Sequence, residues 1–462
     1  MLEHLFNPES ISVVGASSDP RKIGHAVLEN LVLQGYGGRI YPVNPASSEI
    51  MGLKCYPSLE AITSHVDLAV ITLPAKQSVD LLEQCVKKKI PYAVIVAGGF
   101  SEAGEEGRVL ETRLREIIKG TGTRVIGPNT VGVLFPYTGV NTALTPHDRL
   151  FFPEKGEVGF ISQSGALGLL VMDSITEYRM GISGFINIGN RADIAETDSL
   201  RLFEADPNTK SIVMYLESVS DGEQFFKTVK EVNRKKPVII LKTGRSLEST
   251  RAAASHTGAM ASNDRVFSGI MRQAGITRAY DETELLDFGK ALAYQRPPPG
   301  KRVAVITTAG GVGVLTTDLL TSPDNHGRLE MASFNDEETR EMRKFVLPFA
   351  SVANPIDLTA DGSTEAYGKI LDVLVRSDSV DAIIAYALPQ TPKINMDIVG
   401  TLKLAASSKP VVAGAIGNRL SKVMLGELEA ARIPAFPSVS RTVGAMKVLC
   451  EYGEYLRRHR ND

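Results

Sequence analysis

One histidine in this chain of 462 residues stands where it could carry out chemistry. His256 lies in the middle of 251–259, a run of small and polar residues that reads RAAASHTGA. Small neighbours let an imidazole approach a reacting phosphorus atom, and histidine can act as a nucleophile. The run has little apolar surface to hold it down, so we expect a mobile loop. His256 is therefore a candidate phosphoryl carrier, and the alternative is a surface or structural histidine.

A carboxylate that could support this histidine follows a predicted strand. Glu217 comes directly after the apolar run 212–216, which reads IVMYL. In open α/β sheets, ligands bind at the carboxyl ends of the strands. A carboxylate at that edge can hold an imidazole in one tautomer and stabilise its charged form. The alternative is a glutamate that only begins a helix.

Three glycine-rich turns each follow an apolar run and precede a helical pattern. They lie at 13–24 (VVGASSDPRKIG), 161–168 (ISQSGALG) and 307–313 (TTAGGVG). Glycine lets backbone N–H groups approach a phosphate, and the N-terminus of the following helix favours the anion. Ser164 has the residue type of a helix N-cap, and Lys22 adds a positive charge suited to a phosphate-rich ligand. The alternative for each turn is a glycine needed only for packing.

These turns do not match the common nucleotide-binding or hydrolase motifs. The first lacks GxGxxG spacing, and the strand after it ends in Asn44 and Pro45 instead of the acidic residue that binds a nicotinamide ribose. The second has Ser162 two residues before Ser164, so it is not the GxSxG elbow of hydrolases. The third lacks the Gly-Lys-Ser/Thr of a Walker A loop.

Predicted strands and predicted helices alternate along the whole chain. Apolar runs such as 68–73 are followed by helical patterns such as 77–88. This alternation predicts parallel sheets with helices on both faces. The pattern restarts near residues 157 and 302, and the second restart follows the proline run at 296–301. We therefore predict an α/β fold with three Rossmann- or flavodoxin-like domains over 1–140, 150–295 and 302–462.

Composition argues against several classes of protein. Hydrophobic residues make up 43% and charged residues 23%, with a formal net charge of -2, so nothing indicates a nucleic-acid or membrane-surface protein. No apolar run approaches the length of a membrane span, and no signal peptide is visible. The spacing of Cys55, Cys85 and Cys450 fits neither a zinc site nor a disulfide framework. We predict a cytoplasmic protein without a metal site of its own.

At these motifs the chain resembles a known family, the α subunits of ADP-forming acetyl-CoA synthetases. These enzymes are also called acetate–CoA ligases and belong to the superfamily of succinyl-CoA ligase. The resemblance covers essentially the whole chain. The segments that carry it are SVVGAS with the following KIG, ISQSGALG, GNRAD at 189–193, and AAASHTGA around His256. It implies an acid–thiol ligase in which a CoA-binding domain precedes two succinyl-CoA-ligase-like domains.

The resemblance assigns roles to particular residues. It implies a CoA-binding first domain, with Gly15, Ala16, Ser17 and Lys22 at the phosphates, Asn44 and Pro45 at the adenosine, and Pro74, Gly98 and Gly99 near the pantetheine arm. It makes His256 the transiently phosphorylated histidine and Glu217 its supporting carboxylate. It matches Ser164 and Gly165 to the start of one phosphate-holding helix, and Gly310 and Gly311 to the start of a partner helix.

The same resemblance implies a reversible reaction in three steps. Phosphate attacks an acyl-CoA to give an acyl phosphate and CoA, His256 takes the phosphoryl group, and ADP becomes ATP. The chain contains no ATP-grasp-like region, so ADP or ATP with Mg²⁺ is expected on a separate β subunit, in an α2β2 hetero-oligomer. Acetyl-CoA is the default substrate. The sequence leaves open which acyl group is used, whether ADP or GDP is the nucleotide, and whether the chain is active without its partner.

Two other interpretations of the residues also stay open. The chain could be a CoA-binding regulatory protein that has lost catalysis, although the presence of both His256 and Glu217 argues against this. It could instead be an NAD-dependent oxidoreductase that uses the first glycine turn. Asn44 in place of an acidic residue argues against that second interpretation.

Overall fold

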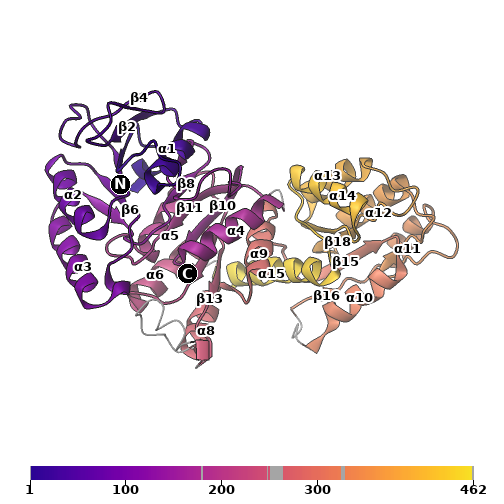
Figure 1. Ribbon diagram of the computed structural model, residues 1–462. Helices are drawn as coiled ribbons and strands as arrows, with labels where there is room; N and C mark the ends of the chain where they lie inside the picture. Colours follow the sequence, from indigo (N-terminus) through magenta and orange to yellow (C-terminus); the bar gives the residue numbers. More distant parts are fainter. Residues whose placement is uncertain (1, 178–179, 247, 250–263, 324–327, 460–462) are drawn as a thin grey trace. The chain divides into compact units, whose positions relative to one another are not determined.

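The computed structural model describes residues 2–177, 180–246, 248–249, 264–323 and 328–459 (Figure 1). The chain divides into two compact units, Met1–Glu282 and Thr283–Asp462. Among the described residues, no helix combines the length and apolar character that crossing a bilayer requires.

The first unit begins with a five-stranded parallel sheet in the order β2-β1-β5-β6-β7. Its inner strands are buried along their whole length, which is typical of parallel sheets covered on both faces. Figure 1 shows α2 and α3 side by side against this sheet. The strands are β1 Ser10–Val14, β2 Arg39–Val43, β5 Leu68–Ile71, β6 Tyr92–Ile95 and β7 Arg124–Ile126; the helices are α1 Ile23–Leu33, α2 Ala75–Lys87 and α3 Glu105–Ile118; short pieces are η1 Leu2–Leu5, β3 Glu49–Ile50, β4 Leu53–Lys54 and η2 Ser101–Ala103.

A second sheet of seven strands completes this unit, in the order β14-β13-β12-β10-β11-β8-β9. Strands β10 to β14 pair in parallel, whereas β8 and β9 are antiparallel to their neighbours. The strands are β8 Val133–Phe135, β9 Val140–Asn141, β10 Lys155–Ser162, β11 Ile182–Asn187, β12 Ser211–Leu216, β13 Val238–Lys242 and β14 Thr277–Ala279; the helices are α4 Gly165–Glu177, α5 Glu196–Ala205, α6 Gly222–Asn233 and α8 Asp264–Gln273.

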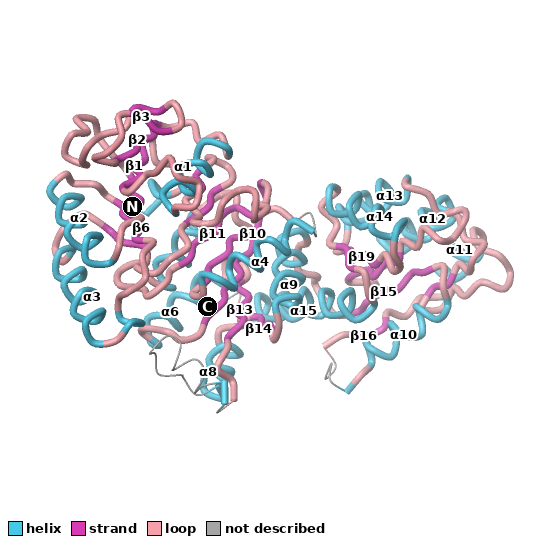
Figure 2. The backbone as a smooth tube through the Cα atoms, viewed as in Figure 1, coloured by secondary structure: helices cyan, strands magenta, loops and turns pink. Residues whose placement is uncertain are grey.

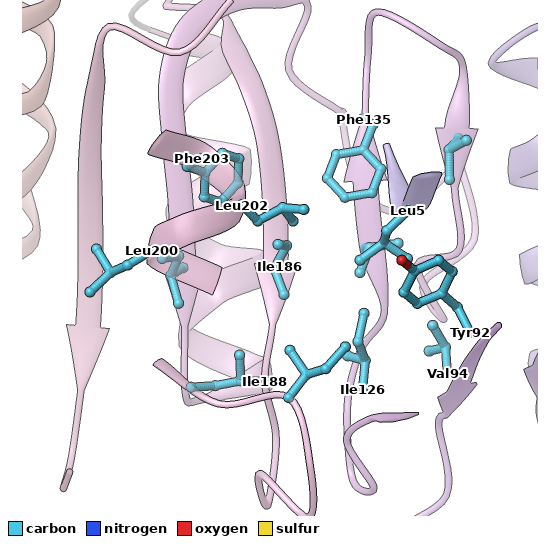
Figure 3. Close-up of a cluster of buried hydrophobic side chains, with 14 of the residues drawn as sticks. Leu5, Tyr92, Val94, Ile126, Phe135, Ile186, Ile188, Leu200, Leu202 and Phe203 are labelled. Carbon is cyan, nitrogen blue, oxygen red and sulfur yellow. The ribbon is translucent and has the colours of Figure 1, made fainter. Parts of the chain in front are cut away.

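One hydrophobic core joins the two sheets of the first unit. Val94 and Ile126 from the first sheet belong to the same buried cluster as Phe135, Ile186 and Phe203 (Figure 3). Phe135 lies on β8, so strands from the end of the predicted first domain pair within the second sheet. The end of the range predicted for the first domain thus belongs to the second sheet. The limits of the three domains stay a prediction.

The second unit contains a third parallel sheet, in the order β16-β15-β18-β19-β20 with β17 also paired to β15. Helices α11 to α14 contribute to the core on one face, and α10 contacts α15 on the other (Figure 2). The strands are β15 Arg302–Thr307, β16 Glu330–Met331, β17 Ile356–Asp357, β18 Ala382–Tyr386, β19 Val411–Gly414 and β20 Ala435–Phe436; the helices are α9 Glu282–Tyr294, α10 Gly310–Thr321, α11 Asp336–Arg343, α12 Thr364–Arg376, α13 Asp397–Ser408, α14 Arg419–Ala430 and α15 Val439–Arg458. The predicted α/β class with parallel sheets is confirmed.

Candidate functional site

The first glycine turn is shaped by two close backbone approaches. Gly15 follows β1 with a φ of 92°, and a Cβ there would lie 2.6 Å from Oγ1 of Thr72. A Cβ on Gly24 would overlap the carbonyl oxygen of Gly15. The first turn of α1 therefore lies directly against the loop, and only glycine fits at both positions.

Charge at this turn is distributed unevenly. Ala16 and Ser17 are buried, and the Ser17 hydroxyl accepts a hydrogen bond from the N–H of Asp19 at 3.1 Å. Asp19 pairs with Arg21 at 2.9 Å, and hydrogen bonds from Arg21 lower the pKa of Asp19 to about 2. These two charges offset each other. Lys22 is exposed at the N-cap of α1, where no side chain caps the helix. The turn thus combines a helix start that no side chain caps with one exposed lysine, an arrangement that suits an anion.

The other residues predicted to bind CoA follow neighbouring strands of the first sheet. Asn44 comes directly after β2, and its Nδ2 donates to the carbonyl oxygen of Ala16 at 2.8 Å. Pro45 and Pro74 are exposed, and Pro74 is the N-cap of α2 after β5. Gly98 and Gly99 are exposed after β6. Because these strands are parallel, all nine predicted residues lie at one edge of the sheet, the carboxyl edge.

A glutamate that the sequence analysis missed shapes the loop after β6. Glu102 accepts hydrogen bonds from the N–H groups of Gly99 at 2.6 Å and Phe100 at 3.2 Å. Burial acts to raise the pKa of Glu102, but these bonds and one from Asn190 lower it overall. The loop is therefore held by an ionised carboxylate, and no sequence motif indicated a role for Glu102.

The second glycine turn begins helix α4. The Ser164 carbonyl oxygen accepts from the N–H of Gly168 at 3.1 Å, and its hydroxyl lies 3.4 Å from the N–H of Leu167. A Cβ on Gly165 would lie 2.7 Å from Cγ1 of Val131. The predicted N-cap position of Ser164 is confirmed, and the N-terminus of α4 opens at the carboxyl edge of the second sheet.

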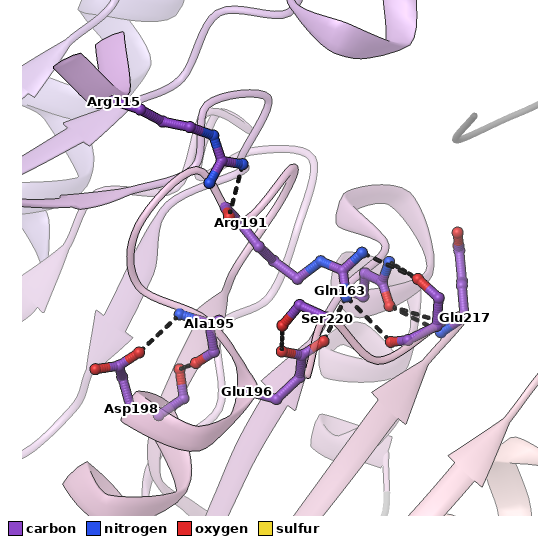
Figure 4. Close-up of polar contacts among 10 residues, drawn as sticks. Arg115, Gln163, Arg191, Ala195, Glu196, Asp198, Glu217 and Ser220 are labelled. Carbon is purple, nitrogen blue, oxygen red and sulfur yellow. Dashed lines mark hydrogen bonds and ion pairs between the residues drawn. The ribbon is translucent and has the colours of Figure 1, made fainter. Parts of the chain in front are cut away.

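Gln163 joins this turn to Glu217. Its Oε1 accepts hydrogen bonds from the N–H of Glu217 at 2.9 Å and of Ser218 at 3.1 Å (Figure 4). Glu217 is 8% exposed, directly after β12. Burial raises the pKa of Tyr215, and the charge of Glu217 adds to this rise. The structure thus brings Glu217 beside the start of α4, and Gln163 is a residue that the sequence analysis did not identify.

Arg191 extends the same network from the GNRAD segment at 189–193. Its Nη2 donates to the Ser218 hydroxyl at 3.0 Å and its Nη1 to the Ser218 carbonyl at 3.1 Å. Nη1 also pairs with the buried carboxylate of Glu196, which accepts a hydrogen bond from Ser220 at 3.0 Å (Figure 4). Sequence analysis used this segment only to establish the resemblance and gave Arg191 no role.

Two further predictions concern other parts of the chain. His256 lies outside the described residues. Gly310 and Gly311 begin α10 in the second unit, where a Cβ on Gly310 would lie 2.9 Å from Oδ2 of Asp357 and one on Gly311 would meet open space. Among the described ranges, no group of three or more His, Cys, Asp or Glu side chains could hold a metal ion.

Comparison with protein families gives matches along most of the chain. A "CoA binding domain" model matches residues 9–136. A "Succinyl-CoA ligase like flavodoxin domain" model matches 155–292, and a "Ligase-CoA domain" model matches 303–453.

Individual relatives match nearly the full length of this chain. The α subunit of acetate–CoA ligase [ADP-forming] I from Pyrococcus furiosus is 37% identical, and the match covers 99% of each chain. Acetate–CoA ligase [ADP-forming] I from Archaeoglobus fulgidus is 34% identical over 99% of this chain and 65% of the relative. The solved structure of acetyl-coenzyme A synthetase 1 from Ca. Korarchaeum cryptofilum, in complex with phosphate and ADP, superposes with a TM-score of 0.91 at 37% identity and covers 99% of both chains.

Proposed function

The chain belongs to the family of the α subunits of ADP-forming acetate–CoA ligases, and on this premise we propose that it is the catalytic, CoA-binding subunit of an acid–thiol ligase. The reaction interconverts acyl-CoA, ADP and phosphate with a carboxylic acid, CoA and ATP. One observation carries the proposal beyond family membership, namely that Glu217 meets the start of α4 through Gln163.

The carboxyl edge of the first sheet binds CoA in this proposal. The N-terminus of α1, which no side chain caps, and the charge of Lys22 suit the CoA phosphates. The exposed glycines at 98–99 leave room for the pantetheine arm beside a loop that Glu102 holds in shape. A titration of the full chain with CoA by calorimetry tests this assignment.

The thioester step takes place at the start of α4. Inorganic phosphate attacks the thioester carbonyl, the C–S bond breaks, and CoA leaves as the acyl phosphate forms. The N-terminus of α4 at Gly165 stabilises the anion without offering a nucleophile that competes with phosphate. Ser164 caps the helix here and is no nucleophile.

His256 then takes the phosphoryl group from the acyl phosphate. A ring nitrogen bonds to phosphorus, the bond from phosphorus to the acyl oxygen breaks, and the carboxylate leaves. The Glu217 carboxylate stabilises the charge that the imidazole gains. Its burial supports this role, because a charge interaction is stronger where water is excluded.

ATP formation completes the reaction on a second protein. Phosphohistidine passes its phosphoryl group to ADP, and Mg²⁺ on a β subunit compensates the charge of the nucleotide. Relatives are named as α subunits, and a Korarchaeum relative was solved with phosphate and ADP, which supports such a partner. We propose an α2β2 assembly in the cytoplasm, with a second phosphate-holding helix that begins at Gly310 and Gly311.

Acetyl-CoA is the proposed substrate because relatives that are 34–37% identical to this chain are named for acetate. Steady-state rates of ATP formation, measured with acetyl-, propionyl- and aryl-CoA in the presence of the β subunit, test this choice. A rate with acetyl-CoA that is lower than with either of the others would contradict it.

The decisive experiment looks for phosphate on His256. The full chain with its β subunit is incubated with acetyl-CoA and phosphate, or with acetyl phosphate, and analysed by mass spectrometry under non-acidic conditions. We expect one acid-labile phosphate on His256. His65→Ala is the matched control, because the His65 side chain is exposed and pairs with Asp67, far along the chain from the candidate site. No label, or label elsewhere, would contradict the proposal.

A further inference from the structure

The segment 189–193 between β11 and α5 is fixed against the first sheet. A Cβ on Gly189 would overlap the carbonyl oxygen of Pro128, and Gly189 has a φ of 53°. The N–H of Asn190 donates to the same carbonyl at 2.9 Å, and the N–H of Ala192 donates to that of Gly127 at 3.0 Å. The segment comes from the second sheet, yet its backbone is bonded to the loop that follows β7 of the first.

Asn190 directs this segment towards the loop proposed to bind pantetheine. Its Nδ2 lies 2.5 Å from Oε2 of Glu102 and 3.1 Å from Oε2 of Glu111. The other oxygen of Glu102 holds the N–H groups of Gly99 and Phe100. One amide therefore sets the position of the carboxylate that shapes the glycine loop.

Arg191, the next residue, directs the segment towards the phosphate site. Its side chain is 12% exposed and its partner Glu196 is 1% exposed. The charge of the guanidinium is thus compensated by a buried carboxylate. Its two contacts to Ser218 hold both the hydroxyl and the carbonyl of the residue after Glu217.

Gln163 contacts the backbone of Ser218 from the side opposite Arg191. It accepts from the N–H groups of Glu217 and Ser218, and it immediately precedes Ser164 at the start of α4. Ser218 is therefore held from two sides, by Gln163 and by Arg191. Both sets of contacts restrain the backbone next to Glu217.

We propose that Arg191 is a positioning residue for phosphoryl transfer, which holds Glu217 in place through Ser218 while its neighbour Asn190 fixes the pantetheine loop. This inference rests on the proposed function. The pentapeptide at 189–193 thereby sets the spacing between the pantetheine loop and Glu217. Misplacement by about 1 Å at a reacting centre can cost about 100-fold in rate.

The test compares three variants of the full chain in complex with the β subunit. Arg191→Gln removes both contacts to Ser218 and the pairing with Glu196. Ser218→Ala removes the hydroxyl contacts to Arg191 at 3.0 Å and to Gln163 at 3.4 Å, and keeps the carbonyl contact to Arg191. Arg124→Gln is the matched control, because Arg124 binds the same segment through Asp193 at 2.9 Å and does not reach Ser218. Each variant is assayed for the rate of His256 phosphorylation at saturating acetyl phosphate, for the Kd of CoA, and for thermal melting.

Arg191→Gln should lower the phosphorylation rate by about 10- to 100-fold, and Ser218→Ala should lower it less. Both should keep the Kd of CoA within about twofold of wild type, which a general loss of structure would not do. Arg124→Gln should lower the melting temperature but keep the rate within about twofold of wild type.

Several outcomes would overturn the inference. A folded Arg191→Gln variant that is phosphorylated at the wild-type rate would do so, and so would an Arg124→Gln variant as slow as Arg191→Gln. Should Arg191→Gln fail to fold, a wild-type rate in Ser218→Ala overturns it instead. If the wild-type chain carries no phosphate on His256, the proposed function itself is wrong and the inference falls with it.

Discussion

The two candidate ligand-binding edges of the first unit are built in different ways. At the carboxyl edge of the first sheet, the predicted residues are mostly exposed turns, such as Lys22, Pro74 and the glycines at 98–99. At the carboxyl edge of the second sheet, Gln163 and Glu217 are each 8% exposed and take part in a continuous hydrogen-bond network. The first edge presents backbone shape, and the second presents fixed polar side chains.

The two edges are therefore sensitive to different kinds of mutation. A site built from backbone shape fails when a Cβ is added, because the close approach is lost. A site built from buried polar groups fails when one group is removed, because its partners are left without a hydrogen bond.

The largest expected effect separates chemistry from binding. His256→Ala should lower ATP formation from acetyl-CoA, ADP and phosphate by more than about 1,000-fold, because the nucleophile is gone. The Kd of CoA should stay unchanged, since the first sheet is untouched. Coupled assays of ATP and calorimetry with CoA measure the two quantities. A variant that still makes ATP would show that the two edges work without a phosphohistidine.

The next effect probes the buried network. Glu217→Gln keeps the shape of the side chain and removes its charge, so phosphorylation of His256 should slow by about 100-fold. Quenched reactions with acetyl phosphate, followed by mass spectrometry, give the rate. Glu223→Gln is a suitable control, because Glu223 is an exposed glutamate in the first turn of α6. Equal rates for wild type and Glu217→Gln would remove the supporting role of this carboxylate.

A glycine substitution probes the edge built from backbone shape. Gly24→Ala places a Cβ on the carbonyl oxygen of Gly15, and such overpacking costs about 1–3 kcal/mol. We expect CoA affinity to fall by about 10-fold while phosphorylation by acetyl phosphate is kept. Gly122→Ala is the control, because a Cβ there meets nothing within 4 Å. If both variants bind CoA equally well, the turn does not act through its close approach.

The smallest effect concerns the exposed ion pair at the same turn. Hydrogen bonds from Arg21 lower the pKa of Asp19 to about 2, so the contribution of this pair is lost only as the pH falls through that value. CoA affinity should therefore show no step from Asp19 between pH 5 and pH 8. Asp19→Asn should leave the melting temperature unchanged. A pH-dependent step that Asp19→Asn abolishes would contradict this expectation.

Much of the candidate site could be predicted because its signals are local. The turn at Gly15, the cap at Ser164 and the position of Glu217 after a strand each depend on a few consecutive residues. Strand–helix alternation likewise predicts which ends of the strands meet at one edge. The roles given to Gln163 and Arg191 were absent from the prediction, since neither residue has a local signature.

Short stretches of sequence predict the α/β class, the three glycine turns and the residue types available at the sheet edges. The contacts from Gln163 to Glu217, 54 residues away, and from Arg191 to Ser218, 27 residues away, arise only in the folded chain. The same is true of the addition of β8 and β9 to the second sheet. Turns and strands follow from short-range periodicity and backbone sterics, whereas these contacts depend on how distant elements pack around one buried core, which local periodicity does not encode.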